Sequence, residues 1–245
     1  MKRSASGGGH GVREWREGQA VPAGSFLQER IDGEPCSIVF VAAGGRAVPL
    51  GFCRQLIGDA AFGSSGYRYC GNILTAAPED GEALAAACAI AAAVAEEFAL
   101  VGVNGIDLIV EDGVPCAIEV NPRWCASMDL VEREYGLSVF GSHAAACRDG
   151  ALPDVDLASL RGQARTRGKA VVFARHDVVA SGTADWLSAR DDESCHRRDV
   201  PKPGTRIAAG EPVCTVYAEG RDAADCRAEL VHRAERVYTA LNAML

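Results

Sequence analysis

The chain has 245 residues, of which 48% are hydrophobic and 24% charged, and its formal net charge at pH 7 is −8. This composition is ordinary for a globular protein, and the length is enough for one large domain or for a domain with a small appendage. The negative charge argues against general binding to nucleic acid through counterion release. No apolar run is long enough for a membrane span, and the N-terminus has no apolar signal-peptide core. We therefore expect a cytoplasmic protein without nucleic-acid or membrane partners.

The chain contains ten cysteines, which are scattered singly and form no Cys-x-x-Cys pair. Most of them lie within apolar segments. We interpret them as reduced, small core residues rather than as disulfides or zinc ligands.

A glycine-rich segment, Gly7-Gly8-Gly9-His10-Gly11, follows Lys2 near the N-terminus. Such a loop exposes backbone N–H groups that can bind phosphate, and a lysine adds a positive charge. The Walker A pattern is absent. A glycine-rich terminus can equally be a flexible tail, so this segment alone leaves both interpretations open.

Three strands and a long helix are predicted next. Strands at 25–31, 36–42 and 46–56, separated by glycine-containing turns, predict an antiparallel meander. A loop over 58–71, rich in glycine, serine and aromatic residues, then leads to a helix at 78–100, whose first turn is acidic.

Residues 105–123 predict a β-hairpin, because two β-branched runs flank Asp112-Gly113, a strong turn dipeptide. With a three-residue loop, Asp107 faces Glu119, and Asn121 lies on the same face. With a two-residue loop, Asp107 and Glu119 would fall on opposite faces. With the three-residue loop, the other face of the hairpin is expected to point to the core and to carry Ile106, Leu108, Val110, Cys116, Ile118 and Val120.

Two carboxylates and an amide oxygen held together would repel one another without a cation between them. Hard oxygen ligands suit Mg²⁺, which proteins usually share with substrate phosphates. The hairpin therefore predicts a metal site formed by Asp107, Glu119 and Asn121.

The rest of the chain predicts two helices, at 128–135 and 139–148, and then a smaller lobe. We expect a core over 1–150, a linker over 151–168 and a small C-terminal lobe over 169–245. The expected elements of this lobe are strands at 169–174, 205–207 and 213–218 and a helix at 222–244.

In this order the features resemble the ATP-grasp superfamily, the fold of biotin carboxylase and of the D-alanine and glutathione ligases. Glu119-Val120-Asn121-Pro122-Arg123 resembles the Glu-x-Asn-Pro-Arg signature, and Asp107 resembles the first metal-binding carboxylate. Lys2 with its glycine loop resembles the phosphate-binding lysine and loop, and residues 26–33 resemble the strand that contacts adenine. The resemblance implies an α+β fold, with an ATP-grasp-type antiparallel sheet, flanking helices and a small α/β C-terminal lobe.

The resemblance also implies a reaction. An ATP-grasp ligase uses ATP and Mg²⁺, or Mn²⁺, to activate a small-molecule carboxylate as an acyl phosphate, which an amine or a similar nucleophile then attacks. The residues that would act are Lys2, Gly7, Gly8 and Gly9 at phosphate, Gln28 and Glu29 at adenine, Glu34 at ribose, Asp107, Glu119 and Asn121 at the metal, and Arg123, with Lys2, in catalysis. Arg54, Gln55, Arg68, Tyr69 and Asn72 either line the substrate cleft or serve the fold.

This sequence departs from complete members of the superfamily, which carry an α/β domain ahead of the glycine loop. We expect a truncated gene product, a misplaced start or a partner subunit that supplies this domain, and a homodimer is a separate option. The alternative function is thus a non-catalytic or truncated nucleotide-binding subunit. A reaction like that of biotin carboxylase is a third option, which the C-terminal lobe suggests. Fold analogy does not specify the substrate.

Overall fold

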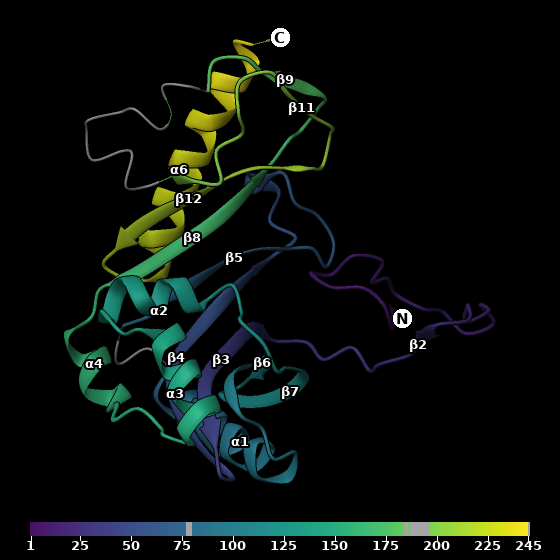
Figure 1. Cartoon of the computed structure of the whole chain (residues 1–245). Helices are drawn as coiled ribbons and strands as arrows, with labels where there is room; N and C mark the ends of the chain where they lie inside the picture. Colours follow the sequence, from purple (N-terminus) through teal and green to yellow (C-terminus); the bar gives the residue numbers. More distant parts are fainter. Residues whose placement is uncertain (77–79, 184–185, 187–196, 245) are drawn as a thin grey trace.

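The computed structural model describes residues 1–76, 80–183, 186 and 197–244. An eight-stranded sheet organises the chain, with strand order β10-β12-β8-β5-β4-β3-β6-β7 (Figure 1). Every neighbouring pair in this sheet is antiparallel. The expected α+β class, with an antiparallel sheet and flanking helices, is therefore confirmed.

The strands of the large sheet are β3 (Glu34–Ala43), β4 (Arg46–Ile57), β5 (Tyr69–Leu74), β6 (Gly102–Glu111), β7 (Val114–Asn121), β8 (Thr166–Phe173), β10 (Arg197–Arg198) and β12 (Pro212–Gly220). Two small two-stranded sheets add β1 (Lys2–Arg3) with β2 (Ser25–Phe26), and β9 (Val178–Ala180) with β11 (Thr205–Ile207). The helices are α1 (Gly81–Glu97), α2 (Met128–Tyr135), α3 (Val139–Asp149), α4 (Leu157–Gln163) and α6 (Ala223–Asn242), with a 3₁₀ turn at Ala60–Phe62.

Helices cover both faces of the sheet. The alanine stripe of α1 packs on one face of β3, β4 and β6, against large side chains such as Phe40 and Phe52. Helices α2 and α3 cover part of the opposite face, where Met128 and Leu130 are fully buried. Helix α6 packs on β8 and β12 through apolar residues spaced three and four apart, from Cys226 to Leu241.

The predicted elements and the observed ones differ most near the N-terminus. Of the strand expected over 25–31, only Ser25–Phe26 pairs, because its partner β1 has only two residues. The N-terminal segment lies to one side of the large sheet, in purple in Figure 1. The first residues of the predicted helix at 78–100 fall partly outside the described residues, and α1 is described from Gly81.

The large sheet runs without interruption into the C-terminal part of the chain, because β8 pairs with β5 on one side and with β12 on the other. Residues 151–168, which we predicted as a linker, contain α4 and the first residues of β8. The division into a core and a small lobe stays a prediction.

In the part of the chain that the structure describes, no helix is long and apolar enough to cross a membrane. The nine described cysteines are free, and five of them are buried.

Candidate nucleotide and metal site

The hairpin of β6 and β7 brings the predicted metal ligands together. Asp107 lies opposite Glu119, and Gly105 lies opposite Asn121. Directly paired residues share a face, and so do residues two apart on one strand. The two carboxylates and the amide therefore lie on one face, as predicted.

The turn that produces this register differs from our expectation. Glu111 pairs with Val114, so the loop has two residues, Asp112 and Gly113, with φ of 48° and 80°. Positive φ at both positions is typical of a type I′ turn. A regular ladder from this turn would put Asp107 opposite Ile118 and Glu119 on the other face.

A β-bulge corrects the register. Leu108 pairs with Ala117 whereas Asp107 pairs with Glu119, so Ile118 is the extra residue. The carbonyl of Ile118 accepts a hydrogen bond from the Gln28 side chain, at 3.2 Å from Nε2. The bulge is thus what places Glu119 opposite Asp107.

The predicted core face of the hairpin is partly wrong for the same reason. Ile106 and Leu108 are fully buried. Cys116, in contrast, pairs with Ile109 on the Asp107 face and is exposed. Val120 is on the expected face but is 37% exposed, because β7 is the edge strand of the sheet.

Both oxygens of the Asp107 carboxylate accept hydrogen bonds from amides. Gln55 Nε2 donates to Oδ1 at 2.8 Å, and Asn121 Nδ2 donates to Oδ2 at 3.1 Å. Arg123 Nη2 donates to Asn121 Oδ1 at 2.7 Å, which fixes the orientation of that amide. The carboxylate, the amide and the guanidinium therefore form one connected cluster.

The electrostatics of the cluster favour an added positive charge. Burial raises the pKa of the Asp107 carboxyl, and the charge of Glu119 raises it further, whereas the hydrogen bonds from Gln55 and Asn121 and the charge of Arg123 lower it. The net shift of this pKa is upward. A cation between Asp107 and Glu119 would offset both unfavourable effects.

The donor set fits Mg²⁺ or Mn²⁺ that takes its remaining ligands from phosphates. Two carboxylates and one amide oxygen are hard ligands, too few to enclose the ion alone. Among the described residues, no group of three or more His, Cys, Asp or Glu side chains could hold a metal. An ion at this hairpin would therefore depend on a bound nucleotide.

The glycine loop lies against the segment that enters β5. Tyr69 N donates to Gly8 O at 3.1 Å. Gly9 has φ of +79°, and a Cβ atom there would lie 1.8 Å from the Tyr67 carbonyl oxygen. Only glycine fits at this position, which supports an ordered loop over a free tail.

The other predicted ligand-binding residues have varied surroundings. Glu34 forms an ion pair with Arg54, at 3.3 Å between Oε1 and Nη1, and Gln28 binds the bulge carbonyl as described above. Glu29 is exposed, and Lys2 pairs through its backbone with Phe26. Their contacts with adenine, ribose and phosphate stay predictions.

Sequence reasoning missed Lys169, which extends a polar row on the same face of the sheet. From Gln55 the register continues to Asn72 on β5 and to Lys169 on β8. Lys169 is only 8% exposed, and its Nζ lies 2.6 Å from Asp129 Oδ1, whose other oxygen accepts from the Tyr217 hydroxyl. Lysine at the start of an apolar strand was the available signal.

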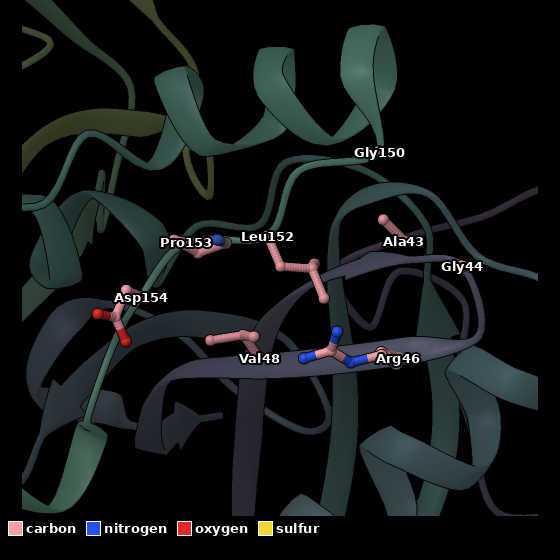
Figure 2. A pocket seen from close by; sticks show the side chains of 8 residues that line it. All are labelled: Ala43, Gly44, Arg46, Val48, Gly150, Leu152, Pro153 and Asp154. Atoms are coloured by element: carbon pink, nitrogen blue, oxygen red, sulfur yellow. The ribbon is translucent and has the colours of Figure 1, made fainter.

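A cavity of about 450 Å³ lies elsewhere, between the β3–β4 turn and the segment after α3 (Figure 2). Its lining includes Ala43, Arg46 and Asp154. Ala43 is the last residue of β3, whereas Asp107 pairs with Ser37 in the first half of that strand. The cavity is therefore not part of the hairpin site.

Comparison with known proteins identifies the fold. An uncharacterized protein from Methanocaldococcus jannaschii is 27% identical over 126 residues, which are 51% of this chain and 28% of that protein. The L-amino acid ligase from Bacillus licheniformis superposes with a TM-score of 0.64 at 15% identity, over 84% of this chain and 51% of the ligase.

The phosphoribosylglycinamide synthetase from Anaerococcus prevotii superposes with a TM-score of 0.58 at 13% identity, over 82% of this chain and 52% of that enzyme. At these identities the two structures show a shared fold. The chain spans only 28% of the archaeal relative and about half of each enzyme.

The ATP-grasp domain model matches residues 1–127, which contain the glycine loop, Asp107 and the Glu-x-Asn-Pro-Arg motif. This chain therefore belongs to the ATP-grasp family.

Proposed function

We propose that the chain binds Mg-ATP between the glycine loop and the β6–β7 hairpin and acts as a carboxylate–amine ligase. The observation that carries this proposal is the direct opposition of Asp107 and Glu119, next to Asn121, within the family match. Like charges directly opposite on a sheet are destabilising. The placement of both carboxylates on one face is therefore better explained by ligand binding than by a contribution to stability.

The proposed roles follow the resemblance of these segments to the motifs of the family. Lys2 and the N–H groups of Gly7, Gly8 and Gly9 bind phosphate oxygens, and residues 28 and 29 bind the adenine edge. Glu34 has no role in this proposal, because it pairs with Arg54 on the opposite face of the sheet from Asp107. Asp107, Glu119 and Asn121 hold the metal. The loop, docked on the entry to β5, limits access of water to the phosphates.

The reaction that we propose activates a small-molecule carboxylate as an acyl phosphate, which an amine then attacks. Bound Mg²⁺ would supply charge neutralisation at the phosphates. Arg123 stabilises the negative charge that develops on the reacting groups, and its bond to Asn121 Oδ1 holds it beside the hairpin. ATP as cosubstrate fits a cytoplasmic location.

Calorimetric titration with ATP, with and without Mg²⁺, tests the metal assignment. Replacing both carboxylates, Asp107→Ala with Glu119→Ala, is expected to abolish the Mg²⁺-dependent part of ATP binding. Glu111→Ala is the matched control, because Glu111 is an exposed acid on the same strand beside the turn. Unchanged Mg-ATP affinity in the double variant would refute the assignment.

The second candidate is nucleotide binding without turnover by this chain alone. The chain spans 51% of the Bacillus licheniformis ligase. In this second candidate, a partner subunit would complete the substrate site. A screen of carboxylic acids with amines, read as ADP release, separates the two candidates. ADP release that needs both a carboxylate and an amine supports the ligase, whereas Mg-ATP binding without release supports the second candidate.

A further inference from the structure

Gln55 reaches Asp107 of the β6–β7 hairpin from two strands away. The strand order here is β4-β3-β6, and Ser37 on β3 pairs with Cys53 on one side and Asp107 on the other. Gln55 lies two residues beyond Cys53, on the same face of β4. With about 4.8 Å between neighbouring strands, the Gln55 side chain passes over β3 to reach Asp107 Oδ1.

Asp107 accepts hydrogen bonds from two side-chain amides, Gln55 and Asn121, and only Asn121 is also a proposed metal ligand. Asn121 donates to Asp107 Oδ2, but Asn121 is itself a proposed metal ligand through its amide oxygen. A metal that recruits this oxygen competes with the present orientation of the Asn121 amide. Gln55 has no such second task in the proposed site, so its hydrogen bond can persist in both states.

We propose that Gln55 is a positioning residue, which orients the Asp107 carboxylate for the metal that accompanies the nucleotide. This inference rests on the proposed function. A carboxylate has about four acceptor positions, so Asp107 can keep the Gln55 bond and still bind a cation. Partners that orient metal ligands in this way are typically worth about 10–100-fold in metal affinity.

The surroundings of Gln55 favour this role over one in the fold alone. Gln55 is half-buried. The hydrogen bond from its side-chain amide to Asp107 joins two polar groups on a face of the sheet that α2 and α3 cover elsewhere. The half-buried Asp107 carboxylate without this donor would be freer to rotate toward other partners. The bond therefore specifies one orientation of Asp107 before any ligand arrives.

Binding of Mn²⁺ tests the inference directly. Mn²⁺ is titrated into the protein with a non-hydrolysable ATP analogue, and free Mn²⁺ is measured by electron paramagnetic resonance. Gln55→Met keeps the side-chain length but removes the amide donor, and it is expected to raise the Mn²⁺ dissociation constant about 10–100-fold. Nucleotide affinity without a divalent ion is expected to stay unchanged.

Two further variants keep the test interpretable. Gln55→Leu also lacks a donor, and it should weaken Mn²⁺ binding similarly if Gln55→Met does not fold. Ser37→Ala is the matched control, because Ser37 lies beside Asp107 on the same face and, among the described residues, its hydroxyl makes no hydrogen bond. Its Mn²⁺ affinity should equal that of the unmodified protein.

The outcomes separate this inference from the proposed function. If the unmodified protein binds no Mn²⁺ with the analogue, the proposed metal site is refuted and the inference falls with it. If the unmodified protein binds Mn²⁺ and folded Gln55→Met binds it equally well, only the inference is overturned. In that case, a loss of ligase activity in Gln55→Met would assign Gln55 to the substrate.

Discussion

A buried carboxylate, Asp80, joins three parts of the fold at the start of α1. Arg161 on α4 is 3% exposed, and its Nη2 lies 3.1 Å from Asp80 Oδ2. Arg54 Nη2 on β4 lies 3.0 Å from Oδ1, and the Thr75 hydroxyl donates to Asp80 as well. We expect loss of one partner of this cluster to be strongly destabilising, because the remaining charge is shielded from water.

The substitution Asp80→Asn removes the charge that compensates Arg161. Breaking a buried ion pair on one side costs about 3–5 kcal/mol, since a charge stays buried without its partner. For a chain of this size each 1 kcal/mol shifts Tm by about 2–4 °C, so the expected loss is about 10 °C. Arg161→Met is expected to cost less, about 1–3 kcal/mol, because Asp80 keeps Arg54 and Thr75.

Urea unfolding at pH 7 of the two single variants and the double variant measures the coupling. The double variant should be more stable than the sum of the single effects predicts, by about 1 kcal/mol or more. Asp149→Asn is the control, because its pair with Arg148 is exposed and worth little. An Asp80→Asn effect within about 0.5 kcal/mol, or strict additivity, would refute the reasoning.

The same carboxylate predicts a pH dependence. Burial opposes ionisation of Asp80, but the hydrogen bonds from Thr75, Arg54 and Arg161 outweigh it and leave the pKa of Asp80 below its usual value of 3.8. A lowered folded-state pKa stabilises the protein above the unfolded-state value, and this stability is lost as pH falls through the folded value. Asp80→Asn should therefore lose less stability than the unmodified protein below about pH 4.

Two further predictions concern the loop and the polar row. Gly9→Ala should prevent docking of the glycine loop, because its Cβ would meet the Tyr67 carbonyl, and it should raise the KM for ATP about tenfold or more. Gly7→Ala is the control, because a Cβ at Gly7 would have open space around it. Equal KM values for the two variants would contradict the docking. Lys169→Met should cost about 2–4 kcal/mol in thermal unfolding because it removes the cation beside half-buried Asp129, and an unchanged Tm would show that this pair contributes nothing.

The β6–β7 hairpin shows how much of the candidate site can be predicted from the sequence. The Asp112-Gly113 dipeptide predicts the turn, and the spacing of Asp107 and Glu119 predicts that they meet, which they do. The assumed three-residue loop was wrong, since a two-residue turn and a bulge give the same opposition. A bulge depends on how the edge strand packs and on a distant donor, Gln28, so the local pattern does not specify it.

Contacts between distant parts of the chain were the least predictable. Arg161 and Asp80 are 81 positions apart, and no periodic pattern relates them. The strand predicted over 25–31 was expected to include residues 27–31, but strands require a neighbour and β2 ends at Phe26. Local preference was overridden there by the absence of a paired strand among the described residues.

The dipeptide Arg54-Gln55 illustrates why a sequence motif identifies the residues of a site more readily than the residues that hold them in place. The sequence suggested that both side chains could enter the cleft, yet neighbours on a strand point to opposite faces, so only one of them can. Gln55 binds Asp107, whereas Arg54 binds Asp80 on the face that α1 covers. Strand β4 therefore contacts both the start of α1, through Arg54, and the β6–β7 hairpin, through Gln55. A change in its pairing with β3 would disturb both, whereas a substitution of either side chain alone separates the stability of the fold from the geometry of the site.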